Sequence, residues 1–194
     1  MTIIRTPEPP DADGTWAQLY AGDLDTLGYV PSHTRVMATN PEAQRAFEAL
    51  VGAVVPSIGL RLYELVTLAA AGAIGSQACR LAHGRKSRTL FDDAQLELIA
   101  RDFRTAGLTQ LEVAAMEVAE RVSGDSAAMT EADTLRLREL GLTDRQIVDV
   151  VLAAAARNYY SRALHALAVP PDVPPDLPEP LREALAGGLP DQHA

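Results

Sequence analysis

The stretch ELVTLAAAGAIGSQACRLAHG, residues 64–84, combines a helix-forming run with the only cysteine of the chain. Alanine and leucine dominate its first half, and two closely spaced glycines then interrupt the pattern. Because glycines weaken a helix, we expect one helix over about 59–71 and a second that begins near Ser76, whose hydroxyl suits an N-cap. The stretch therefore predicts two consecutive helices, with Cys79 in the first turn of the second.

The same helical pattern extends in both directions. Three helix starts carry capping-box residues, in which a threonine hydroxyl meets exposed amides and the third residue reaches back. We expect further helices over about 16–21, 41–55, 92–106 and 143–167, others that begin at Thr109 and Thr130, and a brief one within 181–187. Strand-like alternating runs are missing. The chain is therefore predicted to be all-α, a single domain of about seven to nine helices over residues 1–194.

Two proline-rich segments flank this bundle. Residues 1–14 and 170–194 are predicted to be extended arms, because prolines and acidic residues break regular structure there. The apolar residues of the second arm need cover, which the body of the protein or a neighbouring subunit can provide. The run VVLAAAA, residues 150–156, is apolar nearly all round and indicates a helix at the centre of a bundle or in a subunit interface.

Composition limits the possible partners. The 194 residues carry 17 basic and 26 acidic side chains, a net charge of -9. This field repels phosphate backbones and anionic lipids, so nucleic acid and membrane surfaces are poor partners. We expect a cytoplasmic protein without a membrane span. A single cysteine cannot form an internal disulfide, so any thiol chemistry needs a second thiol from elsewhere.

The cysteine stands in a position that can make it reactive. At a helix start, exposed amides and the helix dipole favour a thiolate over a thiol, and His83 lies one turn later on the same face. Arg80 and Arg85 are expected to add positive potential. Two other interpretations stay open: Cys79 as a small core residue, and a zinc site of cysteine, histidine and a carboxylate, against which the lack of a second Cys/His cluster argues.

This segment resembles the signature of the carboxymuconolactone decarboxylase and alkylhydroperoxidase D (AhpD) superfamily. In that signature a glutamate precedes a CxxC motif by twelve positions, and a histidine follows it by four. Glu64, Ser76, Cys79 and His83 keep the spacing, with serine in place of the first cysteine. The similarity continues through GYVPSH at 28–33 and through residues 131–169, which resemble the tail of the peroxidase-related branch.

The resemblance implies an AhpD-like helical bundle and a set of roles. Cys79 would be the reactive thiol, His83 the base that handles its proton, and Glu64 the group that orients His83. Without the first cysteine, an oxidised Cys79 must wait for an external thiol or a lipoyl group. Asn158 and Arg162, an NxxxR pattern, would bind substrate or support the site. The implied function is one-cysteine reduction of a hydroperoxide.

Two alternatives remain. The family's second activity is decarboxylation or proton transfer on a small lactone or cyclic acid, in which His83 and Glu64 would act as acid and base without a thiol. A non-catalytic member would serve as an oligomeric binding module, and the resemblance implies a homo-oligomer, a trimer or hexamer. Neither a dinucleotide-binding motif nor a phosphate-binding loop occurs, so we expect no cofactor and no metal.

Overall fold

The computed structural model describes residues 2–187 and is built from α-helices. Within these residues there are ten, of which nine have seven or more residues, and no strand. The helices are α1 Gly14–Leu27, α2 Ser32–Met37, α3 Pro41–Ile58, α4 Leu60–Ala73, α5 Gln77–Ser87, α6 Asp93–Asp102, α7 Gln110–Asp125, α8 Glu131–Glu139, α9 Asp144–Ala166 and α10 Glu179–Ala186. The prediction of an all-α bundle is confirmed.

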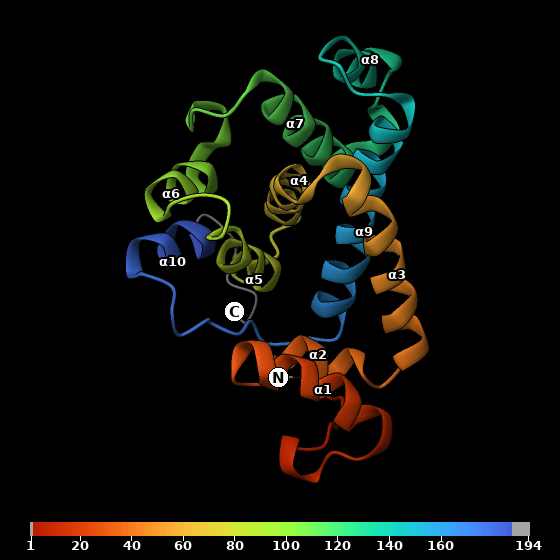
Figure 1. Cartoon of the computed structure of the whole chain (residues 1–194), viewed down its shortest axis with the longest axis vertical. Coiled ribbons are helices and arrows are strands. Elements are labelled where there is room, and N and C mark those ends of the chain that lie inside the picture. Colours follow the sequence, from red (N-terminus) through yellow and green to blue (C-terminus); the bar gives the residue numbers. More distant parts are fainter. Residues whose placement is uncertain (1, 188–194) are drawn as a thin grey trace.

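Helix α4 forms the centre of the bundle. Every residue from Leu62 to Ala71 is buried, and α4 packs against α5, α7 and α9 (Figure 1). Helix α9 contributes Val150, Ala153 and Ala154 to the same core, whereas Leu152 and Ala155 of the same apolar run are exposed, so one face of the run is buried and the other is not. This arrangement places α4, which carries Glu64, next to α9, and side-chain hydrogen bonds join α9 to Cys79 of α5.

The break between α4 and α5 lies where the glycines predicted it. Gly75 has a φ of 70°, in the left-handed region that a side chain disfavours, and α5 begins two residues later. The chain thereby reverses within three residues and brings α5 alongside α4. The capping boxes at Thr109, Thr130 and Thr143 are also present, at the starts of α7, α8 and α9.

The N-terminal region contains more helix than the sequence pattern indicated. Helix α1 spans Gly14–Leu27, 14 residues, and is longer than the helix predicted over residues 16–21. Helix α2 was not predicted. Helix α2 is a six-residue segment that follows Pro31, too short to show a helical period. Both helices lie at one end of the bundle (Figure 1).

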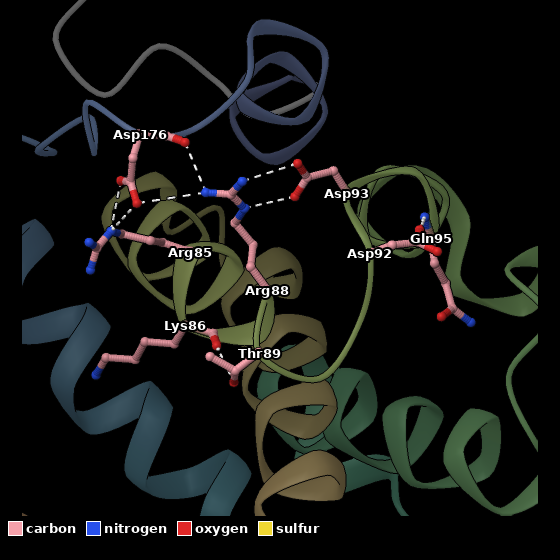
Figure 2. Close-up of polar contacts among 8 residues, drawn as sticks. All are labelled: Arg85, Lys86, Arg88, Thr89, Asp92, Asp93, Gln95 and Asp176. Atoms are coloured by element: carbon pink, nitrogen blue, oxygen red, sulfur yellow. Dashed lines mark hydrogen bonds and ion pairs between the residues drawn. The ribbon is translucent and has the colours of Figure 1, made fainter.

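The proline-rich segment after α9 crosses the surface of α5 as an extended strap, residues 170–178. Asp176 accepts hydrogen bonds from Arg85 and its carbonyl accepts one from Arg88, which also pairs with Asp93 (Figure 2). Helix α10 then packs against α5 and α6. Leu177, Leu181 and Leu185 of the arm are buried there and Val173 is exposed, so the three leucines in the described part of the arm find cover on the body of the protein.

Within residues 2–187, no helix has both the length and the apolar character that crossing a lipid bilayer requires.

Candidate active site

Cys79 lies in the first turn of α5, as predicted, and its sulfur accepts hydrogen bonds from α9. The Ser161 hydroxyl donates to Sγ at 3.0 Å, and Nη1 of Arg157 donates at 3.6 Å. The other terminal nitrogen of Arg157, Nη2, donates to the Tyr63 hydroxyl at 3.3 Å. Two donors of one helix therefore converge on the sulfur, an arrangement that stabilises negative charge on it.

His83 and Glu64 form a buried pair beside the cysteine. Nδ1 of His83 lies 2.6 Å from Oε2 of Glu64, which joins α5 to α4. The side chains of this pair are 8% and 5% exposed, so water screens their interaction weakly. Helix pairing thus brings Glu64 onto the imidazole, as the family spacing implied. Within the described residues, no hydrogen bond joins the His83 ring to the Cys79 sulfur. Both side chains line the same cavity.

That cavity has a volume of about 640 Å³, within the range of small-molecule sites. Its polar lining residues are Cys79, His83, Glu64, Tyr63, Arg157, Tyr160, His33, Lys86, Asp23, Thr34, Gln44 and Glu48. Its apolar wall is made mainly by Leu19, Phe47, Val51, Val55, Leu60 and Leu164, from α1, α3, α4 and α9. The buried sulfur therefore borders a space that accepts a molecule with an organic body.

Electrostatics keep the cavity histidines neutral. Burial and then the charge of Arg157 lower the pKa of His83 to about 4, against the smaller opposing effect of Glu64. Burial and then the charge of Lys86 lower the pKa of His33 to about 3. Burial raises the pKa of Glu64, but the charge that the His83 ring carries when it is protonated, together with its hydrogen bond, outweighs this effect, so that the pKa of Glu64 lies below its ordinary value. Near pH 7 the pair is thus a neutral ring that donates from Nδ1 to a carboxylate, which leaves Nε2 as an acceptor.

Arg157 remains a cation in this environment. Burial alone lowers the pKa of its guanidinium, but the neighbouring Cys79 and Tyr63 groups raise it by more. Sequence reasoning missed both Arg157 and Ser161, although a signal was present. On α9 they share one face with Tyr160 and Leu164 at spacings of three, four and seven residues, so an arginine falls on a face that is otherwise apolar or small.

Ser76 holds the predicted N-cap position of α5, but its hydroxyl does not cap. The side chain is fully buried, and its oxygen has no hydrogen-bond partner among the described residues. The Ser76 backbone N–H donates to the Ala71 carbonyl at 2.8 Å, so the residue belongs to the tight turn that links α4 to α5. The expectation that Ser76 keeps a capping role is therefore wrong.

The two arginines expected to add positive potential are directed elsewhere. Nη2 of Arg80 donates to the carbonyls of Ala100 and Ala184 at 2.5 and 3.2 Å, at the ends of α6 and α10. Arg85 binds Asp176 of the strap. The cation beside the sulfur is Arg157 instead, which a comparison of sequence neighbours could not identify.

Asn158 and Arg162 connect α9 to the end of α7 and do not line the cavity. Asn158 donates to the Ser123 hydroxyl at 3.0 Å, and Arg162 donates to the Ser123 carbonyl at 3.2 Å. Their part in the site is thus limited to support of α9. His33 also lines the cavity. His193 lies outside the described residues.

Across residues 2–187, no group of three or more histidine, cysteine, aspartate or glutamate side chains is arranged to hold a metal ion. The site consists instead of organic acid–base groups and one thiol.

Known structures with the same arrangement of helices support this interpretation of the fold. A peroxidase-related protein from Ralstonia eutropha, described as an alkylhydroperoxidase AhpD core, matches with a TM-score of 0.76 and 23% identity over 95% of this chain and 96% of its own. The chain has the AhpD-like fold. A second match, an uncharacterized peroxidase-related protein from Silicibacter sp. TM1040, has a TM-score of 0.74 and 26% identity over 88% of this chain and 95% of its own.

The AhpD-like fold also occurs in an enzyme with a different reaction. The debrominase Bmp8, in a cysteine-to-alanine variant bound to 2,3,4-tribromopyrrole, matches with a TM-score of 0.76 and 18% identity over 95% of this chain and 96% of its own. No protein-family model and no curated protein sequence matches the chain. The fold is therefore established by structure, and the reaction has to be argued from the site.

Proposed function

We propose that the protein is a one-cysteine hydroperoxide reductase that uses an external thiol. The observation that carries this proposal is the position of the Cys79 sulfur. It borders a cavity of about 640 Å³, accepts hydrogen bonds from two donors, and shares the cavity with the Glu64–His83 pair. A nucleophile, a neutral base and an orienting carboxylate in one cavity are the groups that a thiol peroxidase needs.

The reaction begins with the proton of the thiol. His83 is neutral near pH 7, and Nδ1 is engaged with Glu64, so Nε2 is the acceptor. Because no hydrogen bond joins the His83 ring to the sulfur within the described residues, the proton crosses the cavity through a water molecule or the bound hydroperoxide. The thiolate attacks the terminal oxygen, a sulfur–oxygen bond forms, and the oxygen–oxygen bond breaks. Sulfur is oxidised by two electrons, and the released alkoxide takes the proton back as an alcohol.

Regeneration needs a second molecule. Cys79 is the only cysteine, so its sulfenic acid has no partner in the chain. Two equivalents of an external thiol, or one lipoyl dithiol, reduce it and release water and a disulfide.

The cavity supports an organic hydroperoxide as substrate. Apolar side chains from four helices form one side of it, with Phe47 stacked near Tyr159 and Tyr160. A small hydroperoxide alone would leave this surface uncovered. The halogenated ring bound by the debrominase of the same fold also supports a compact organic molecule.

The test compares Cys79→Ala and His83→Ala with wild-type protein, using cumene hydroperoxide and dithiothreitol. We expect Cys79→Ala to abolish hydroperoxide consumption and dimedone labelling, and His83→Ala to slow both by about 100-fold. Ser87→Ala is the control, because it removes a buried hydroxyl without a hydrogen-bond partner from the same helix. Hydroperoxide consumption that survives Cys79→Ala would disprove the proposal.

One observation favours a second candidate. The neutral His83 ring, the Glu64 carboxylate and the buried Arg157 cation also form a site for proton transfer on an anionic lactone or cyclic acid. Such an enzyme would keep its activity in Cys79→Ala and lose it in His83→Ala. An oligomeric binding module without catalysis would be indifferent to both changes.

A further inference from the structure

Arg157 is a buried cation in an unusual environment. The residue is 5% exposed, and its terminal nitrogens contact the Cys79 sulfur and the Tyr63 hydroxyl rather than a carboxylate. The rings of Phe47 and Tyr160 lie 5.9 and 5.8 Å from the guanidinium carbon. A buried charge is costly unless an opposite charge or hydrogen bonds compensate it. The Cys79 sulfur is the group in contact with Arg157 that can supply that charge.

Arg157 also has an unused donor. Its Nε atom is buried and has no hydrogen-bond partner within residues 2–187, although Arg157 lines the cavity. A guanidinium offers five N–H donors in a rigid plane, so a group that binds the sulfur through Nη1 can bind a second acceptor through another nitrogen. A buried, unpaired donor next to a nucleophile is suited to an oxygen that becomes negative during the reaction.

We propose that Arg157 is a catalytic residue of the hydroperoxide reaction. It stabilises the Cys79 thiolate through Nη1 and donates from Nε to the alkoxide oxygen that leaves when the oxygen–oxygen bond breaks. Ser161, one turn further along α9, holds the other side of the sulfur. Arg157 keeps its own protons throughout, and the alkoxide receives the proton that Cys79 gave to His83. This inference rests on the proposed function.

The two effects of Arg157 can be separated by the choice of reagent. Iodoacetamide and cumene hydroperoxide both react with the thiolate, but only the hydroperoxide releases an alkoxide. If Arg157 stabilised the thiolate alone, its removal would slow both reactions equally. If it also binds the leaving oxygen, the hydroperoxide reaction must slow more.

The experiment measures both rates at pH 7 in Arg157→Met and Arg157→Lys. Arg145→Met is the matched control, because Arg145 lies on the same helix with a side chain that is 77% exposed. In Arg157→Met we expect the rate of sulfenate formation by cumene hydroperoxide to fall by about 100-fold or more. The rate of alkylation by iodoacetamide should fall by only about tenfold. Arg157→Lys keeps the charge but not the planar fork, and should slow the hydroperoxide reaction selectively.

The outcomes distinguish this inference from the proposed function. A wild-type protein whose Cys79 forms no sulfenate with hydroperoxide would disprove the function itself. Equal losses of both rates, or an unchanged hydroperoxide rate in either variant, would disprove the role of Arg157 while the function stands. Circular dichroism checks folding, and if Arg157→Met does not fold, the Arg157→Lys comparison decides alone.

Discussion

Replacement of His83 by glutamine should make the stability of the protein less sensitive to acid. In the folded chain burial and Arg157 lower the pKa of His83 to about 4, against 6.5 for a free ring. Between these values the unfolded chain binds a proton that the folded chain does not, so the free energy of unfolding falls as pH decreases from 6.5 to 4. The two pKa values correspond to a loss of about 3 kcal/mol over the whole window and about 2 kcal/mol by pH 5.

Urea unfolding at pH 7.5 and pH 5 measures this difference. Glutamine does not titrate, and its amide can still donate to Glu64, so His83→Gln keeps the buried hydrogen bond while it removes the proton uptake. His33 and the carboxylates other than Glu64 titrate in both proteins and cancel in the comparison. The wild type should lose about 2 kcal/mol more than the variant between the two pH values. Parallel losses would show that His83 is not held neutral by the fold, and the argument for a neutral base would fail.

Two further substitutions test the packing of α5 and its first turn. Gly84→Val should lower the free energy of unfolding in urea by about 2 kcal/mol, because a Cβ atom at Gly84 would lie 2.3 Å from Cδ1 of Leu185. Gly22→Ala is the control and should not destabilise the protein, because a Cβ atom at Gly22 would meet nothing within 4 Å. Ser76→Cys should let the sulfenic acid of Cys79 resolve to an internal disulfide, since the buried serine oxygen has no hydrogen bond to lose. Intact-mass spectrometry after one equivalent of hydroperoxide checks this, and persistent dimedone labelling would contradict it.

Most of the fold could be predicted from the sequence because its signals are local. Capping boxes and the glycine break between α4 and α5 depend on residues a few positions apart, and each was found where the pattern indicated. Helix α2 was missed because six residues after a proline are too few to show periodicity. The sequence indicated that the apolar residues of the second arm need cover, but Leu181 and Leu185 of α10 do not by themselves reveal which surface will bury them.

Some residues of the candidate site could also be predicted from the sequence, and others could not. The Glu64–His83 contact followed from family spacing, and Cys79 lies in the first turn of α5 as expected. The NxxxR pattern directed attention to Asn158 and Arg162, which support α9 from outside the cavity. Arg157, the residue before Asn158, is the one that contacts the sulfur. Successive residues of an α-helix point in directions about 100° apart, so Asn158 points away from the sulfur.

The environment of the sulfur shows why the residues close to Cys79 in sequence did not predict which cation and which donors contact it. The donors on Cys79 come from positions 78 and 82 residues away, on α9, while the arginines close in sequence bind helix ends and the strap. Arg157 and Ser161 are one turn apart on α9, so both contacts depend on the same register of α9 relative to Cys79. The packing of α9 against α3, α4 and α7, and the hydrogen bonds of Asn158 and Arg162 to α7, fix that register. The hydrogen bonds to the Cys79 sulfur therefore depend on tertiary packing that only the folded bundle supplies.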